Sequence, residues 1–182
     1  EDKENVWMYG YFRYDWADGS SPIGSFNESE KTLSPKYRSF FGTKEDAPYY
    51  FYNCLAELTT AGEWYLDRET GLLCVYAPEN REAATYNLSL SLSPVLTINA
   101  DYITLDNLTI KGTRNNGIEL NGNNNTVRNC KIFNVSYGAI LANGSNNTFS
   151  HNEIAHIGGG GISVTGGDKA TLTKGNNLVS NN

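Results

Sequence analysis

The fold is decided by three consecutive stretches of equal length, DYITLDNLTIKGTRNNGIELNG (101–122), NNNTVRNCKIFNVSYGAILANG (123–144) and SNNTFSHNEIAHIGGGGISVTG (145–166). Written one above another, they place apolar residues in the same columns and close each row with glycine. The shared columns are Leu105, Val127 and Phe149; Ile110, Ile132 and Ile154; Ile118, Ile140 and Ile162; and Gly122, Gly144 and Gly166. Self-similarity at a fixed period indicates a repeat architecture, in which each repeat stacks on the next.

Each row consists of short strands. Apolar and polar residues alternate within it, and Asn or Gly separates the alternating segments. One row is too small to close a sheet, so its apolar face must be buried against the next row. We therefore predict an all-β chain in which residues 87–182 form about four coils of a parallel β-helix, with about 22 residues per coil. We expect Ile118, Ile140 and Ile162 to stack inward, and an insertion at 167–174 to form a surface loop.

Residues 1–86 form a different module, because eighteen of the 22 aromatic residues lie at or before Tyr86. Ser-Pro at the start and Gly at the end of 34–42 predict a short helix, and a second short helix is expected at 53–58. Alternation on both sides of a loop at 67–71 predicts a β-hairpin. This alternation favours packing of the hairpin aromatics against the coils over stacking on a sugar ring.

Composition excludes several classes of partner. The net charge is −6, with no cluster of Lys and Arg, so we expect no nucleic-acid partner. No apolar run approaches the roughly 20 residues that cross a bilayer, so we expect no membrane partner, and the charged start at 1–6 suggests that the chain begins inside a longer gene product. We expect no metal site and no cofactor. Three cysteines cannot all pair with one another. Cys130 is expected in the core, and the sequence leaves undecided whether Cys54 and Cys74 form a disulfide.

The coil region carries a family resemblance. The stretch 101–182, with its NNT, NC and HN signatures, resembles right-handed parallel β-helix proteins of the pectate-lyase-like class. The segment 50–78, which carries NCLAELTTAGEWYLDRETGLLCVYAP, looks like a bacterial group in which an aromatic strand, a short helix and the GEWYLDRETG hairpin precede the coils. Such proteins are mostly extracellular carbohydrate-active enzymes, among them glycoside hydrolases that attack plant polysaccharides. The resemblance implies a right-handed helix, a secreted or cell-surface location, and a polysaccharide or oligosaccharide as partner.

Catalytic residues of such an enzyme would lie in the outward columns of the coils. Glycoside hydrolysis uses two carboxylates, separated by about 5 to 9.5 Å according to mechanism, and no outward column contains two acids. Two columns predict cross-coil ion pairs instead, Asp106 with Arg128 and Lys131 with Glu153. Glu119 has no partner in its column and is the weak candidate for a catalytic residue. The other interpretation of Glu119 is a solvated surface carboxylate.

These observations give an expected function. We expect part of an extracellular polysaccharide-degrading enzyme, a glycoside hydrolase rather than a polysaccharide lyase, acting on plant or other complex glycans. The alternative is a non-catalytic carbohydrate-binding or structural β-helix of a cell surface or virion. In the resembling group the acidic active-site residues belong to later coils, so we expect further coils of the parent chain after Asn182 and an incomplete active site here. Asn121, Asn143 and Asp168 are the candidates for carbohydrate binding.

Overall fold

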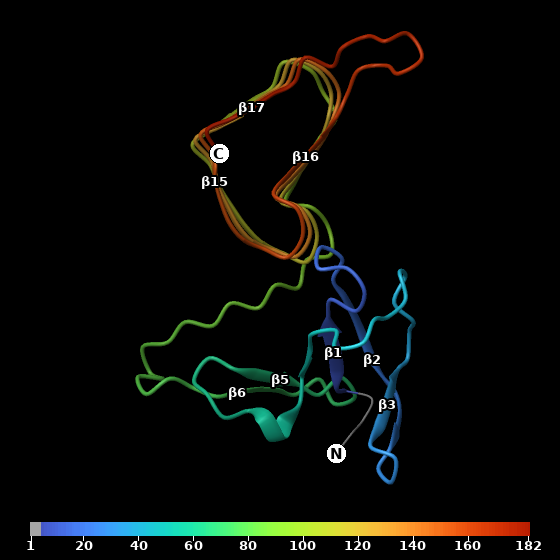
Figure 1. Ribbon diagram of the computed structural model, residues 1–182. Helices are drawn as coiled ribbons and strands as arrows, with labels where there is room; N and C mark the ends of the chain where they lie inside the picture. Colours follow the sequence, from blue (N-terminus) through green and yellow to red (C-terminus); the bar gives the residue numbers. More distant parts are fainter. Residues whose placement is uncertain (1–4) are drawn as a thin grey trace. The chain divides into compact units, whose positions relative to one another are not determined.

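A computed structural model of the protein describes residues 5–182 (Figure 1). The chain divides into two compact units, Glu1–Thr85 and Tyr86–Asn182. Antiparallel strand pairs build the first unit, and parallel pairs build the three large sheets of the second. In the part of the chain that the structure describes, no helix is long and apolar enough to span a membrane.

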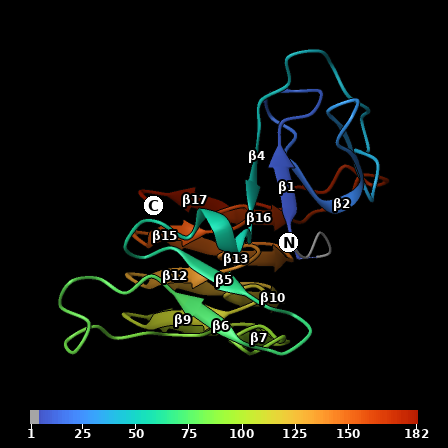
Figure 2. The same cartoon turned by 90° about the horizontal axis from the view of Figure 1, so that it is seen from below.

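The first unit contains a four-stranded antiparallel sheet, of order β3-β2-β1-β4, and a hairpin of β5 and β6 (Figure 2). Its strands are β1 Trp7–Gly10, β2 Gly19–Asn27, β3 Thr32–Pro35, β4 Tyr49–Tyr52, β5 Trp64–Leu66 and β6 Leu73–Val75. Aromatic residues face each other across β1 and β4, where the rings of Tyr9 and Tyr50 lie 5.2 Å apart. The β-hairpin predicted from the alternation is confirmed. Asp67 stabilises its loop by accepting a hydrogen bond from the Thr70 hydroxyl at 2.6 Å.

The predicted helix at 34–42 is wrong. Pro35 ends strand β3, where it lies opposite Ile23. Proline has no N–H to donate, and β3 tolerates it because an edge strand leaves one side unpaired. The contact with β2 continues beyond the strand, since the backbone N–H of Lys36 donates to the carbonyl oxygen of Pro22 at 2.8 Å. Cross-strand pairing has therefore outweighed the local helix signals.

The predicted helix at 53–58 is reduced to one 3-10 turn, η1 Leu55–Glu57. The chain leaves the helical path directly after it, because the carboxylate of Glu63 accepts the backbone N–H groups of Thr59 and Thr60 at 2.8 and 2.7 Å. A side chain thus provides the partner that the next helical turn would have required.

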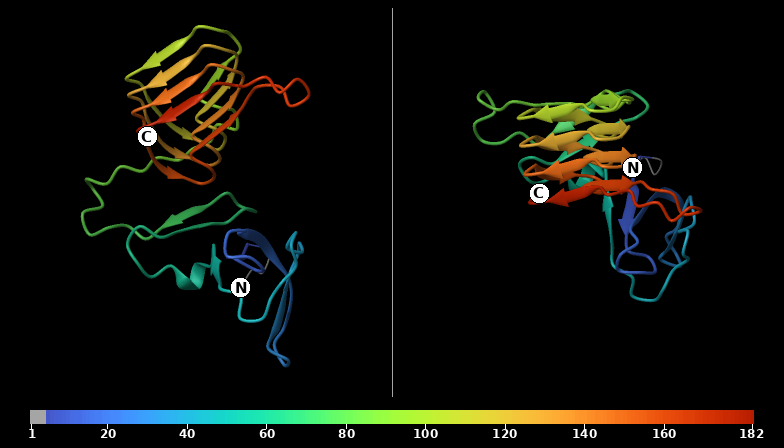
Figure 3. Two further views of the ribbon diagram at one scale, coloured as in Figure 1. Left: turned by 45° about the horizontal axis from the view of Figure 1, so that its top comes forward. Right: turned by 90° about the horizontal axis from the view of Figure 1, so that it is seen from above.

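The second unit is a parallel β-helix of three sheets (Figure 3). The sheets are β7-β10-β13-β16, β8-β11-β14-β17 and β9-β12-β15. The strands are β7 Leu96–Ile98, β8 Thr104–Asp106, β9 Thr109–Thr113, β10 Ile118–Asn121, β11 Thr126–Arg128, β12 Lys131–Val135, β13 Ile140–Asn143, β14 Thr148–Ser150, β15 Glu153–Ile157, β16 Ile162–Thr165 and β17 Leu178–Ser180. The described residues therefore form three complete coils, and β16 and β17 add part of the predicted fourth.

The predicted inward stack is confirmed. Ile118 pairs with Ile140 in the next coil, and Ile140 pairs with Ile162 in the one after. Ile118 and Ile140 are fully buried, and Ile162 packs against the same core. Burial of each such side chain contributes about 1.5–3 kcal/mol, so the repeated columns stabilise the stacking of the coils.

Buried asparagines form a second stack beside the apolar core. Oδ1 of Asn125 accepts the backbone N–H of Ile103, and Oδ1 of Asn147 accepts that of Asn125, at 2.7 and 2.8 Å. The corresponding Nδ2 groups donate to the carbonyl oxygens of Ala100 and Gly122. Each amide therefore satisfies backbone groups at a corner where the chain has left the sheet.

The corners themselves use left-handed backbone. At the corner that follows the β8 sheet, the φ values fall between 53° and 58° in all four turns of the chain, at Asn107, Asn129, His151 and Asn181. Asn adopts this conformation more readily than most residues. The many asparagines of the coil region thus serve two structural purposes, as corner residues and as buried ladders.

Candidate functional site

The predicted carbohydrate-binding residues Asn121 and Asn143 lie together on the outer surface of the sheet β7-β10-β13-β16. Alternation in β10 buries Ile118 and Leu120 and turns Glu119 and Asn121 outward. The pairing of β10 with β13 places Asn143 beside Asn121 in the next coil. We call this outer surface the polar face; it consists of Thr97, Asn99, Glu119, Asn121, Leu141, Asn143, Ser163 and Thr165.

Side chains on the polar face are connected from coil to coil. The Nδ2 of Asn121 donates to Oδ1 of Asn99 at 3.0 Å, and the hydroxyl of Thr165 donates to Oδ1 of Asn143 at 3.1 Å. An amide side chain offers two donor hydrogens and two acceptor lone pairs, so these bonds use only part of its capacity. The rest faces solvent, because Asn99, Asn121, Asn143 and Thr165 are all exposed.

Glu119 is held in place on the same face. Its Oε1 accepts a hydrogen bond from Nδ2 of Asn116 at 2.8 Å, while Oδ1 of Asn116 accepts the backbone N–H of Gly138 at 2.8 Å. The neighbours of Glu119 in the adjacent coils are Thr97 and Leu141. No second carboxylate lies among the residues of the polar face, so the face lacks the acid pair of a glycosidase.

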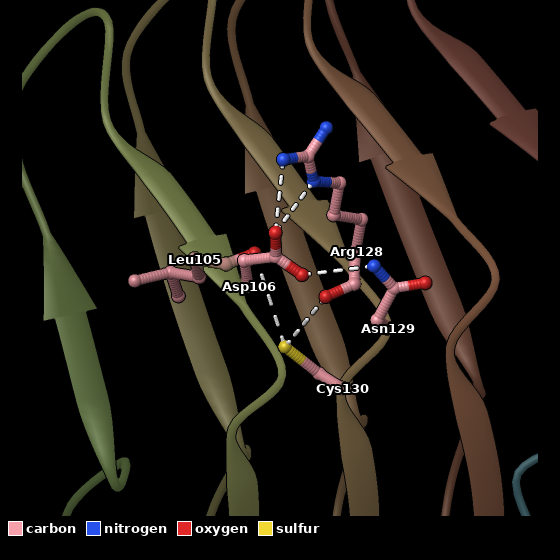
Figure 4. Close-up of polar contacts among 5 residues, drawn as sticks. All are labelled: Leu105, Asp106, Arg128, Asn129 and Cys130. Atoms are coloured by element: carbon pink, nitrogen blue, oxygen red, sulfur yellow. Dashed lines mark hydrogen bonds and ion pairs between the residues drawn. The ribbon is translucent and has the colours of Figure 1, made fainter.

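Asp106 and Glu153, which lie in register with basic residues of the neighbouring coil, form ion pairs. Arg128 Nη2 lies 2.9 Å from Asp106 Oδ2, and Asn129 Nδ2 donates to Oδ1 at 2.8 Å (Figure 4). These two contacts, with that of Asn129 the larger, lower the pKa of the Asp106 carboxyl. Lys131 Nζ lies 3.0 Å from Glu153 Oε2. Both predicted pairs are confirmed, and each joins two neighbouring coils.

The sequence of the second unit matches a known family. Residues 84–182 match the family described as the right handed beta helix region, which is more than half of the chain. The chain belongs to the right-handed β-helix family. No curated protein and no solved structure matches the chain. Family membership establishes the handedness of the coils, and the GEWYLDRETG resemblance stays an interpretation of the sequence.

Asp168, the third predicted binding residue, is not one of the residues of the polar face of this β-helix. It opens the 167–174 loop, which projects from the coils in Figures 1 and 3. Its backbone pairs with that of Thr173, and its Oδ1 accepts the N–H of Ala170 at 2.8 Å. The Ala170 N–H, followed by contacts with Thr171, lowers the pKa of the Asp168 carboxyl. The carboxylate therefore stabilises the turn of its own loop.

Three members of the site were missed in the sequence. Asn99 stands one period before Asn121, and Thr165 stands one period after Asn143, so the period that predicted the core would also have found them. Asn116 gave no such signal, because it contacts Glu119 from the turn that precedes β10 rather than from its column.

Cysteines and potential metal ligands occur in both units. Within residues 5–182, no group of three or more His, Cys, Asp or Glu side chains is arranged to hold a metal ion. Cys54 and Cys74 both keep the thiol form, so the bridge that the sequence left open is not formed. Cys130 is buried, as expected, and its Sγ contacts the carbonyl oxygens of Leu105 and Arg128 (Figure 4).

Proposed function

We propose that this chain binds a polysaccharide along the polar face, as part of an extracellular polysaccharide-degrading enzyme of the glycoside hydrolase type. The observation that carries the proposal is the run of exposed amide and hydroxyl groups from Asn99 through Asn121 and Asn143 to Thr165. Coils of a parallel sheet repeat every ~4.8 Å, so these groups form a straight, evenly spaced row. A glycan chain likewise presents hydroxyl groups at regular intervals along its length.

The chemistry of the face favours a neutral glycan. Sugar hydroxyls are both donors and acceptors, and asparagine amides provide both. The polar face carries one charge, that of Glu119, and no Lys or Arg. A polyuronate would meet repulsion from Glu119 without a compensating cation. Because the side chains stand on paired strands, little freedom is lost when a ligand binds.

A second candidate function is binding without catalysis. It is favoured by the surroundings of Glu119, whose neighbours in the adjacent coils are Thr97 and Leu141. With one carboxylate on the face, a bound sugar would meet no second acid to complete either glycosidase mechanism. The chain would then hold the glycan, as a carbohydrate-binding or structural β-helix of a cell surface or virion does.

The test is calorimetric titration of the protein with xylohexaose, cellohexaose and hexagalacturonate. We expect a neutral hexasaccharide to bind more tightly than the acidic one, and the double variant Asn121→Ala/Asn143→Ala to lose roughly tenfold or more in affinity, as for two lost hydrogen bonds of about 1 kcal/mol each. The matched control is Thr126→Ala/Thr148→Ala, which removes polar groups from the sheet β8-β11-β14-β17. Equal binding by both double variants would contradict the proposal.

A further inference from the structure

The first unit carries exposed aromatic residues on two loops of its sheet. The loops join β1 to β2 and β3 to β4 (Figure 2). We call the group the aromatic cluster; its members are Tyr14, Trp16, Phe40 and Phe41. Trp16 is 71% exposed and Phe40 is 91% exposed. Contiguous apolar surface of this kind marks a binding site more often than isolated exposed residues do.

The aromatic cluster presents one face of the Trp16 indole ring to solvent. Tyr14 stacks on Trp16 with centroids 5.4 Å apart and planes 8° apart. Phe41 contacts both rings edge-on, at 5.5 and 5.3 Å. Tyr14 covers one side of the indole, and since Trp16 remains 71% exposed, its opposite side is open to solvent. Tyr14 therefore supports one face of the indole, and the other face is accessible to a ligand.

The two loops are fastened to each other beside the cluster. The ammonium group of Lys44 lies 2.8 Å from Oδ1 of Asp15, and the backbone N–H of Lys44 donates to the carbonyl oxygen of Phe12 at 2.8 Å. The guanidinium of Arg13 lies 5.9 Å from the centre of the Tyr14 ring. These contacts hold the aromatic cluster in place before a ligand binds, which lowers the entropic cost of binding.

A cavity of about 210 Å³ adjoins the cluster, with Phe40 and Phe41 in its wall. Its polar lining consists of Asp18, Ser20, Ser21, Tyr37, Arg38 and Ser39. Asp18 is oriented by the phenol of Tyr9, whose O–H donates to Oδ2 at 2.9 Å. One carboxylate and one guanidinium balance the charge of the cavity, and each presents hydrogen-bonding groups to a ligand.

We propose that the aromatic cluster and this cavity form a second sugar-binding site, for a neutral pyranose unit; the proposal rests on the proposed function as a polysaccharide-binding protein. A pyranose has a face of C–H groups, which suits the open side of Trp16, and an edge of hydroxyls, which suits Asp18 and Arg38. A nucleobase would also stack, but the chain has net charge −6 and would repel the phosphates. Balanced charge in the cavity favours a neutral ligand.

The experiment titrates the full chain and three variants, Trp16→Ala, Trp16→Phe and Trp64→Ala, with xylohexaose and cellohexaose. Binding is measured by calorimetry and by tryptophan fluorescence. Trp16→Ala should weaken binding at this site by roughly tenfold or more, the scale of one lost stacking contact, and should abolish the fluorescence change. Trp16→Phe should restore part of the affinity. Trp64→Ala is the matched control, because Trp64 is 56% exposed and lies on the hairpin; it should leave binding unchanged.

The outcomes separate this site from the polar face. Loss of binding in Asn121→Ala/Asn143→Ala, with wild-type heat and fluorescence in Trp16→Ala, would overturn the second site and leave the proposed function standing. The reverse pattern would support the second site and overturn the role of the polar face. If Trp16→Ala converted a dimer into a monomer in sedimentation and no sugar bound, the cluster would be an interface between copies, and the sugar assignment would be wrong.

Discussion

Asn147 accepts the backbone N–H of Asn125 at Oδ1, 2.8 Å away in the neighbouring coil. Its Nδ2 donates to the carbonyl oxygen of Gly122 at 2.9 Å, and the side chain is fully buried. Replacing Asn147 by Leu should lower the free energy of unfolding by about 2–4 kcal/mol, because the buried N–H of Asn125 and the half-buried carbonyl of Gly122 both lose their partner. Urea unfolding measures the change. Asn121→Ala, on the exposed surface, is the control and should cost much less; equal costs would contradict the role of the buried ladder.

Gly122 should tolerate no side chain. A Cβ at this position would overlap the carbonyl oxygen of Ala100 in the preceding coil. We expect Gly122→Ala to destabilise the coils by about 1–3 kcal/mol or more, since backbone must move to make room. Gly160→Ala is the control, because no atom lies within 4 Å of a Cβ there. Thermal unfolding of both variants decides the point, and similar melting temperatures would show that the coils can separate at little cost.

Asp106 should make stability depend on pH. Hydrogen bonds from Asn129 and Arg128 lower the pKa of its carboxyl below the unfolded value of about 3.9. A lowered pKa in the folded state means that the charged carboxylate stabilises the protein above the unfolded pKa, and that this contribution is lost as the pH falls through the folded pKa. Asp106→Asn should therefore be less stable than wild type near pH 7, and the difference should shrink below about pH 4. A difference that stays constant down to pH 2 would contradict this account.

Glu119 should not support hydrolysis in this chain. Its neighbours across the sheet are Thr97 and Leu141, so a bound sugar would meet one carboxylate where the mechanism requires two. We expect no release of reducing ends from neutral glycans at an enzymatic rate by wild type, and the same result for Glu119→Gln. Turnover by wild type that disappears in Glu119→Gln would make Glu119 catalytic.

The coils could be predicted from the sequence because their determinants repeat. Ile118, Ile140 and Ile162 follow one another at intervals of one period, and a parallel ladder converts that spacing directly into contact. The same rule predicted the ion pair of Asp106 and Arg128. Any residue whose partner lies one period away can be found in this manner.

Prediction failed where a local signal competed with a distant partner. The Ser-Pro pattern at 34–42 has the form of a helix start, yet strand β2 pairs with that segment. The binding role of Asp168 stays a prediction, and the structure adds that its carboxylate accepts the N–H of Ala170 two residues away. Side-chain orientation in loops depends on such short contacts, which no period reveals.

The 167–174 loop shows where a coil can change its length. Thr126 pairs with Thr148 one period later, whereas the next pair, Thr148 with Leu178, spans a full period and the loop as well, and the sheet remains in register. The extra residues leave the coil at one corner and return to it, as the Asp168–Thr173 bridge closes their base. Segments of new length or composition can therefore be exchanged at this corner, which makes it a suitable place for grafting a foreign peptide.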